Sequence, residues 1–167
     1  TLVPVANAQF PKVPGMAAPN AVHAGGRVRN PQLAGGASEG AELPLLVPQC
    51  DADGNDLGGI RMPDVAVPLG TATGWVFRPT EFGAPHEFYL LRGAWVPFAK
   101  TKDERITAGD SRPSLEERYA GKDDYLAKIK AAAQKLIDQR LLTPDDLESQ
   151  LKGAGERWDW VMSPSAR

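Results

Sequence analysis

Glycine and proline are concentrated in the first 100 residues, which contain 13 of the 17 Gly and 12 of the 15 Pro. Proline fixes its own φ and biases the residue before it toward extended backbone, and glycine weakens helices, so long helices are disfavoured there. Residues 101–167 carry 25 charged residues, few of these breakers, and helical patterning. The sequence therefore predicts two differently structured parts that meet near Lys100.

We predict an α+β fold that is divided into three segments. Residues 1–42 read as an irregular Pro/Gly-rich arm, residues 43–100 as a β-rich segment and residues 101–167 as a helical segment, with one compact unit over 43–167. The arm has too few clustered apolar residues to bury itself, so we expect it to lie on another surface.

The β-rich segment contains short apolar runs separated by turn residues. The run over 42–50 is followed by the turn "DADGND" and then by residues 57–70, which indicates a β-hairpin with Gly54 and Asn55 suited to positive φ. Residues 74–78 and 87–99 are further apolar segments, and the second could be strand or helix. We therefore expect one or two β-hairpins here.

The helical segment has clear boundaries. Ser114 and Glu117 have the spacing of a capping box, and Thr143 followed by Pro144 begins a later helix. Two apolar stripes repeat at helical spacing. Their members are Tyr125, Ile129, Ala132, Ala133 and Leu136 in the first, and Leu147, Leu151, Ala154, Trp158 and Val161 in the second. The short connection predicts an antiparallel helical hairpin.

Overall composition excludes several classes of function. A net charge of −2 does not favour nucleic acid or an anionic membrane surface, and no apolar run is long enough for a membrane span. The N-terminal residues lack a signal-peptide layout. A single cysteine, Cys50, excludes an intrachain disulfide and a cysteine-rich zinc site, and we expect it to be a small buried hydrophobe. Nothing in the sequence indicates a cofactor or a cellular compartment.

The pentapeptide Gly36–Gly40 fits G-x-S-x-G, with Ser38 at the nucleophile position. A nucleophile elbow needs a buried strand before the serine and a helix after it, and neither flank has that pattern. If the chain is an autonomous esterase, Ser38, His86 and Asp64 are the candidate triad, with Glu87 as another carboxylate. The alternative is a glycine-rich loop, with His86 and the other histidine, His23, exposed in loops.

The turn "DADGND" also resembles part of a calcium loop, because Asp51, Asp53 and Asn55 alternate as EF-hand ligands do. Gly54 stands at the fourth position rather than the sixth, and Met62 occupies the twelfth, where a Glu is needed. A hairpin turn is the better interpretation, and a weak cation site is the alternative.

The arginines and the tryptophans could each have a structural or a functional role. The arginines occur among acids, so we expect salt bridges at a surface or between domains; they are Arg61, Arg105, Arg112 and Arg118. The tryptophans could line a ligand cleft; they are Trp75, Trp95, Trp158 and Trp160. Trp158 lies on an apolar stripe, which favours core packing for it.

Three ordered phrases, "LVPQCDADGNDLGGIRMPDVAVPLGTATGWVFR", "GAWVPFAKTKDERITAGDSRPSLEERY" and the helical region ending "RWDWV", carry a family resemblance. They resemble the C-terminal region of large bacterial α/β-hydrolase domain-containing proteins, a family of carboxylic-ester hydrolases. The opening "TLVPVANAQFPKVPGMAAP" resembles the segment that joins their hydrolase core to this region. Cys50 departs from the usual aliphatic residue, and the loop over 30–42 is short and glycine-rich.

The resemblance implies that the serine elbow and catalytic histidine lie upstream, outside this chain. We therefore expect a structural or cleft-forming C-terminal module of an ester hydrolase, whose partners are a small ester and the hydrolase core. An autonomous small esterase is one alternative. A binding module for a separate core chain, or a self-associating module, is another. Members of this family are often exported.

Overall fold

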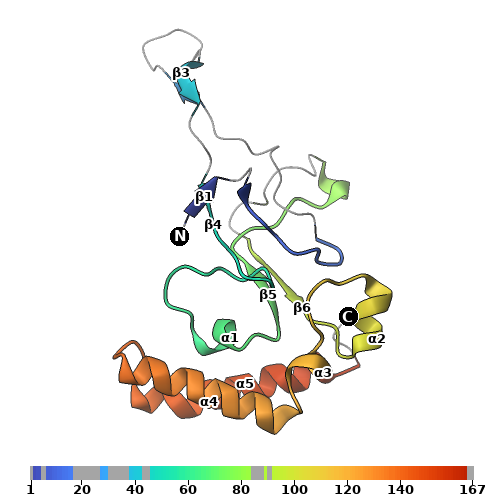
Figure 1. The fold of residues 1–167 in the computed structure, drawn as a ribbon, viewed down its shortest axis with the longest axis vertical. Coiled ribbons are helices and arrows are strands. Elements are labelled where there is room, and N and C mark those ends of the chain that lie inside the picture. The colour runs from blue at the N-terminus through green and yellow to red at the C-terminus, as the bar shows by residue number, and fades with distance from the viewer. Residues whose placement is uncertain are drawn as a thin grey trace.

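A computed structural model describes residues 2–4, 7–16, 27–29, 38–42, 46–83, 89 and 92–164 of the chain. In this part, three two-stranded antiparallel sheets are combined with five α-helices, which confirms the predicted α+β class. Figure 1 shows the two longest helices as a layer at one end of the molecule, with the small sheets above them. None of the helices among these residues is long and apolar enough to cross a membrane.

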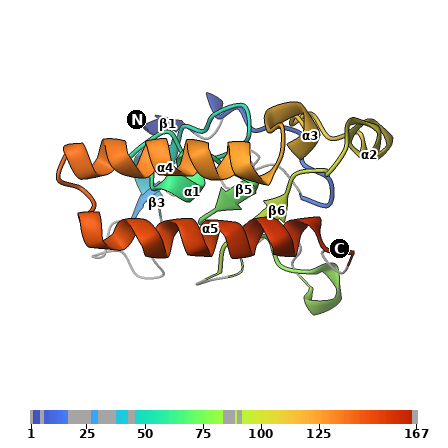
Figure 2. The same ribbon diagram turned by 90° about the horizontal axis from the view of Figure 1, so that it is seen from below.

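The two longest helices form the predicted antiparallel hairpin. Helix α4 spans Lys122–Asp138 and α5 spans Leu147–Met162, after a single 3₁₀ turn, η4, at Pro144–Asp146. They run side by side over their full lengths (Figure 2). This confirms the predicted hairpin. The helices pack in this way because each carries an apolar stripe at helical spacing and the connection between them is short.

The hydrophobic core lies where this hairpin meets the rest of the chain. Tyr125 of α4 stacks on Trp158 of α5 with 5.2 Å between ring centroids, and Tyr119 packs edge-on against Tyr125. Burial raises the pKa of the Tyr119 hydroxyl, which donates to the Pro68 carbonyl at 2.7 Å. Trp158 is therefore a core residue, as its place on the stripe predicts.

The sheet that lies nearest the helical hairpin is formed by β5 (Gly70–Thr73) and β6 (Ala94–Pro97). A Cβ at Gly70 would lie 2.6 Å from the Val96 carbonyl oxygen, so only glycine permits the strands to approach this closely. The short helix α1 (Pro63–Ala66) lies between these strands and α4 (Figure 1). Proline at its first position suits a helix start.

The pairing of the other strands differs from the predicted hairpin over 42–70. β4 (Leu46–Pro48) pairs with β1 (Leu2–Pro4), while only an isolated bridge between Cys50 and Asp56 closes the "DADGND" turn. Gly54 has the predicted positive φ of 82°, and Asn55 does not share it. The prediction of a strand within residues 57–70 is wrong, because Pro63 begins helix α1 inside that range.

Regular structure also occurs within the arm, where the sequence predicts irregular backbone. Besides β1, the strands β2 (Arg27–Arg29) and β3 (Ser38–Glu42) pair with each other through an irregular register. Strands of three to five residues leave too little periodicity to be recognised from sequence.

The described residues contain three further short elements: η3 (Thr80–Phe82), α2 (Lys102–Ala108) and α3 (Leu115–Arg118). The Ser114 hydroxyl accepts from the Glu117 amide, and the Glu117 carboxylate accepts from the Ser114 amide at 2.8 Å. The predicted capping box is thus present at the start of α3.

Candidate functional site

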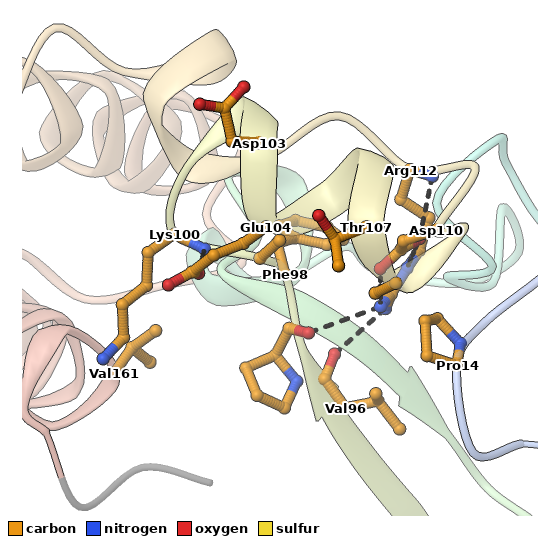
Figure 3. A pocket seen from close by; sticks show the side chains of 13 residues that line it. Pro14, Val96, Phe98, Lys100, Asp103, Glu104, Thr107, Asp110, Arg112 and Val161 are labelled. Atoms are coloured by element: carbon orange, nitrogen blue, oxygen red, sulfur yellow. Dashed lines mark hydrogen bonds and ion pairs between the residues drawn. The ribbon is translucent and has the colours of Figure 1, made fainter.

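An open groove of about 590 Å³ lies between β6, α2 and the C-terminal end of α5, and Pro14 forms one of its edges (Figure 3). Most of its surface is apolar. The apolar lining residues are Pro14, Val96, Pro97, Phe98, Ala99, Ala108 and Val161. A groove of this volume is within the range of small-molecule sites in proteins.

Helix α2 forms one wall of the groove, and residues on one of its faces line that wall. The Thr101 hydroxyl caps its start by accepting from the Glu104 amide at 3.2 Å, and Gly109 ends it in the left-handed conformation. Glu104, Thr107 and Ala108 then lie on one face, at a spacing of three and four residues, and all three line the groove.

Lys100 joins the groove to the end of α5. Its ammonium group donates to the Ser163 carbonyl oxygen at 2.7 Å, and its backbone amide donates to the Glu104 carboxylate at 3.0 Å. In Figure 3 its side chain extends toward Val161. A lysine at a helix C-terminus satisfies carbonyls that lack helical partners and opposes the negative end of the helix dipole.

The floor of the groove is held by a buried ion pair between Arg112 and Asp110, which are 1% and 5% exposed. The Arg112 Nε and Nη2 atoms donate to the two Asp110 carboxylate oxygens at 2.9 and 2.6 Å. One of the remaining N–H groups donates to the Thr71 hydroxyl. The others donate to the Val96 and Pro97 carbonyls (Figure 3). All five guanidinium donors therefore have acceptors, which is the condition under which a buried charge is tolerated.

This network continues away from the groove. The Thr71 hydroxyl donates to the Asp53 carbonyl, and the Asp53 carboxylate forms a two-point ion pair with Arg118. The Arg118 guanidinium lies over the Phe98 ring, 4.0 Å from its centroid. The expectation of surface or interdomain salt bridges is wrong for Arg112, which is fully buried because β5, β6 and Asp110 surround it.

The three candidate cation ligands in the "DADGND" turn have protein partners. One Asp51 carboxylate oxygen accepts from the Asp53 and Asn55 amides, and the other forms an ion pair with Arg61 at 2.7 Å. Within the described residues, no group of three or more His, Cys, Asp or Glu is arranged to hold a metal ion.

The side chain of Asn55 binds the backbone of β5, a role that the turn prediction did not include. Its side-chain amide donates to the Gly70 carbonyl at 3.2 Å and accepts from the Ala72 amide at 2.8 Å, so it pairs with the outer edge of β5 as a short strand would. This buried contact supports the sheet that carries the groove floor.

The candidate triad of Ser38, His86 and Asp64 lies only partly within the described residues. The backbone of Ser38 begins β3, Asp64 lies in α1, and Figure 1 shows these two elements well separated along the long axis of the molecule. His86, Glu87 and His23 lie outside the described residues.

Cys50 is half-buried rather than buried, and its thiol donates to the Gln9 carbonyl at 2.9 Å. Partial burial, together with the carboxylates of Asp51 and Asp56, raises the pKa of this thiol. A raised pKa keeps the thiol protonated and disfavours its use as a nucleophile.

The groove can bind an apolar group, but its lining residues offer little chemistry. No serine, cysteine or histidine is among the described residues that line it, and the charged ends of Lys100, Asp110 and Arg112 are bonded to the protein itself. Sequence reasoning missed this groove, because its walls come from residue 14, residues 96–112 and residue 161, which share no local motif.

Comparison with known proteins gives one match. The sequence model of the family described as "Alpha/beta hydrolase domain" matches residues 9–152. Searches of curated proteins and of solved structures found no match. Since residues 9–152 include β4 to β6, α1 to α4 and most of the groove lining, the match covers most of the structure described above. The chain belongs to this alpha/beta hydrolase domain family.

Proposed function

We propose that the chain is a structural, cleft-forming module of a carboxylic-ester hydrolase, and that its groove forms a wall for the apolar part of the ester. The observation that carries this proposal is the groove between β6, α2 and α5, with its mostly apolar lining. Membership of an alpha/beta hydrolase domain family supports the ester as the ligand class.

The charged residues that line the groove nearly balance, since Lys100 and Arg112 stand against Asp103, Glu104 and Asp110, and this favours an uncharged ligand. Arg112 is neutralised by Asp110, and the Lys100 ammonium is bonded to carbonyls at the end of α5. An apolar acyl or alcohol group can therefore cover the partly exposed Pro14, Val96 and Ala99 without displacing a bound ion pair. Burial of such a group is favourable in proportion to the apolar area removed from water.

The proposal assigns the nucleophile and its histidine to a hydrolase core outside this chain, in agreement with the resemblance of its sequence to a C-terminal region. Whether that core is joined to this chain or is a separate partner does not change the role of the groove. The alternative hypothesis is an autonomous serine esterase that uses Ser38, His86 and Asp64.

Binding to the groove can be tested with ethyl butyrate and ¹⁵N-labelled protein. We expect the ester to shift the backbone amide signals of Val96, Phe98 and Val161. Thr107→Trp places a large ring on the groove face of α2 and should weaken binding at least about tenfold, a loss of about 1.4 kcal/mol. The matched control is Ile106→Trp, because Ile106 lies on the same helix, is exposed and is not part of the lining.

The control variant should bind the ester as the unchanged protein does. Shifts that map elsewhere, or binding that survives Thr107→Trp unchanged, would overturn the assignment of the groove to the ester.

A further inference from the structure

Two tryptophans lie in contact at the surface, away from the core. Trp95 of β6 is 39% exposed and Trp160 of α5 is 55% exposed, and their ring centroids are 5.6 Å apart. Single exposed apolar residues are common, but two adjoining exposed aromatic rings gather apolar surface in one place, as binding sites do. By contrast, Trp158, two residues before Trp160, is buried.

A small hollow of about 60 Å³ lies beside Trp95, which forms one of its walls. Asp64 of α1 and Arg157 of α5 are the charged residues among the described residues that line it, and Tyr125 also lines it. A liquid water molecule occupies about 30 Å³, so the hollow can hold one or two hydroxyl-sized groups and no larger ring.

The charges of the hollow decide which ligand suits it. Asp64 and Arg157 carry opposite charges, so the site has no net attraction for an anion or a cation. Arg157 also interacts with the Tyr125 hydroxyl, whose pKa is raised chiefly by burial. An uncharged hydroxyl can donate to a carboxylate and accept from a guanidinium, so it uses both groups at once.

A ligand that fits both parts needs an apolar face for the indoles and hydroxyl groups at its rim. We propose that Trp95, Trp160 and the hollow lined by Asp64 and Arg157 form a binding site for a neutral saccharide. One pyranose ring packs on the exposed indole faces, and its hydroxyls bond to Asp64 and Arg157. This site is distinct from the groove, since the residues that line the two do not overlap.

The NMR signals of the four indole N–H groups in the full chain allow the two tryptophans of the proposed site to be compared with the two outside it. Cellotetraose and maltotetraose, titrated separately, supply β- and α-linked glucose rings, and tetraethylene glycol is the ring-free control. We expect at least one tetrasaccharide to shift the indole signals of Trp95 and Trp160 while those of Trp75 and Trp158 stay in place. Tetraethylene glycol should shift none of them.

Variant proteins then distinguish the loss of ring stacking on the saccharide from a loss of folding. Trp160→Ala should weaken binding about tenfold, the size of loss expected for an aromatic stacking contact. Trp160→Phe should restore most of the affinity, and Asp64→Asn should weaken it several-fold. Phe82→Ala is the matched control, because Phe82 is an aromatic residue that is 64% exposed and lies outside the site.

The proposal is overturned if neither tetrasaccharide shifts the Trp95 and Trp160 signals up to its solubility limit. It is also overturned if all four indoles shift alike, or if the Trp160→Ala protein, with a dispersed amide spectrum, binds as tightly as the Phe82→Ala protein.

Discussion

Arg112 links both strands of the sheet beside the groove to the turn before α3. Its five donors join Asp110, the Thr71 side chain and the carbonyls of Val96 and Pro97, so one side chain holds two strands and the turn before α3. In the sequence, Arg112 is one of several arginines that occur among acids, and no neighbouring residue indicates that it is buried. Its burial follows from the pairing of β5 with β6, which is a non-local event.

Removing this side chain should be far more costly than removing an exposed ion pair. Arg112→Met leaves the Asp110 carboxylate buried without its partner, and we expect a loss of about 3–5 kcal/mol in the free energy of unfolding. Lys122→Met is the matched control, because it breaks the exposed pair between Lys122 and Asp159 and should cost less than about 1 kcal/mol. Urea denaturation measures both, and equal losses would show that the Arg112 network does not hold the fold.

Among the elements, the helices α3, α4 and α5 were predictable from the sequence, whereas α1 and the pairing of the strands were not. Helices α4 and α5 carry periodic stripes that repeat over several turns, and α3 has a capping box within four residues. Strand β4 instead pairs with β1, more than 40 residues away, and its three residues do not encode that choice. Local signals predict local structure, whereas strand pairing depends on tertiary contacts.

The capping box of α3 predicts a pH dependence. Hydrogen bonds from the Ser114 amide and hydroxyl, followed by Arg105, lower the pKa of Glu117 from 4.5 to about 2. The unfolded chain therefore binds a proton at a higher pH than the folded chain does. The stabilisation from Glu117 is present above about pH 4.5 and is lost as the pH falls toward 2.

Carboxyl ¹³C NMR of Glu117 measures this pKa directly. We expect a midpoint near 2 in the unchanged protein and a higher midpoint in Ser114→Ala, which lacks one donor. Thermal unfolding of Glu117→Gln should differ from the unchanged protein at pH 6 and converge with it near pH 2. A midpoint near 4.5 that Ser114→Ala does not move would rule out this account of the cap.

At the scale of the whole molecule, the resemblance to hydrolases came from ordered phrases spread along the chain, and the family match over residues 9–152 agrees with it. The G-x-S-x-G pentapeptide contributed less, because its serine begins a short strand, β3, rather than following one. The groove could not be predicted, since it exists only when α2, β6 and α5 are packed together.

We propose that this chain forms a cleft and leaves ester hydrolysis to a hydrolase core outside it. The most direct test is turnover of p-nitrophenyl butyrate by the purified chain, with Ser38→Ala measured in parallel and folding checked by circular dichroism. We predict that both proteins release p-nitrophenol at the same rate as buffer. Catalytic turnover that Ser38→Ala abolishes, with an unchanged circular dichroism spectrum, would contradict the claim and establish an autonomous serine esterase.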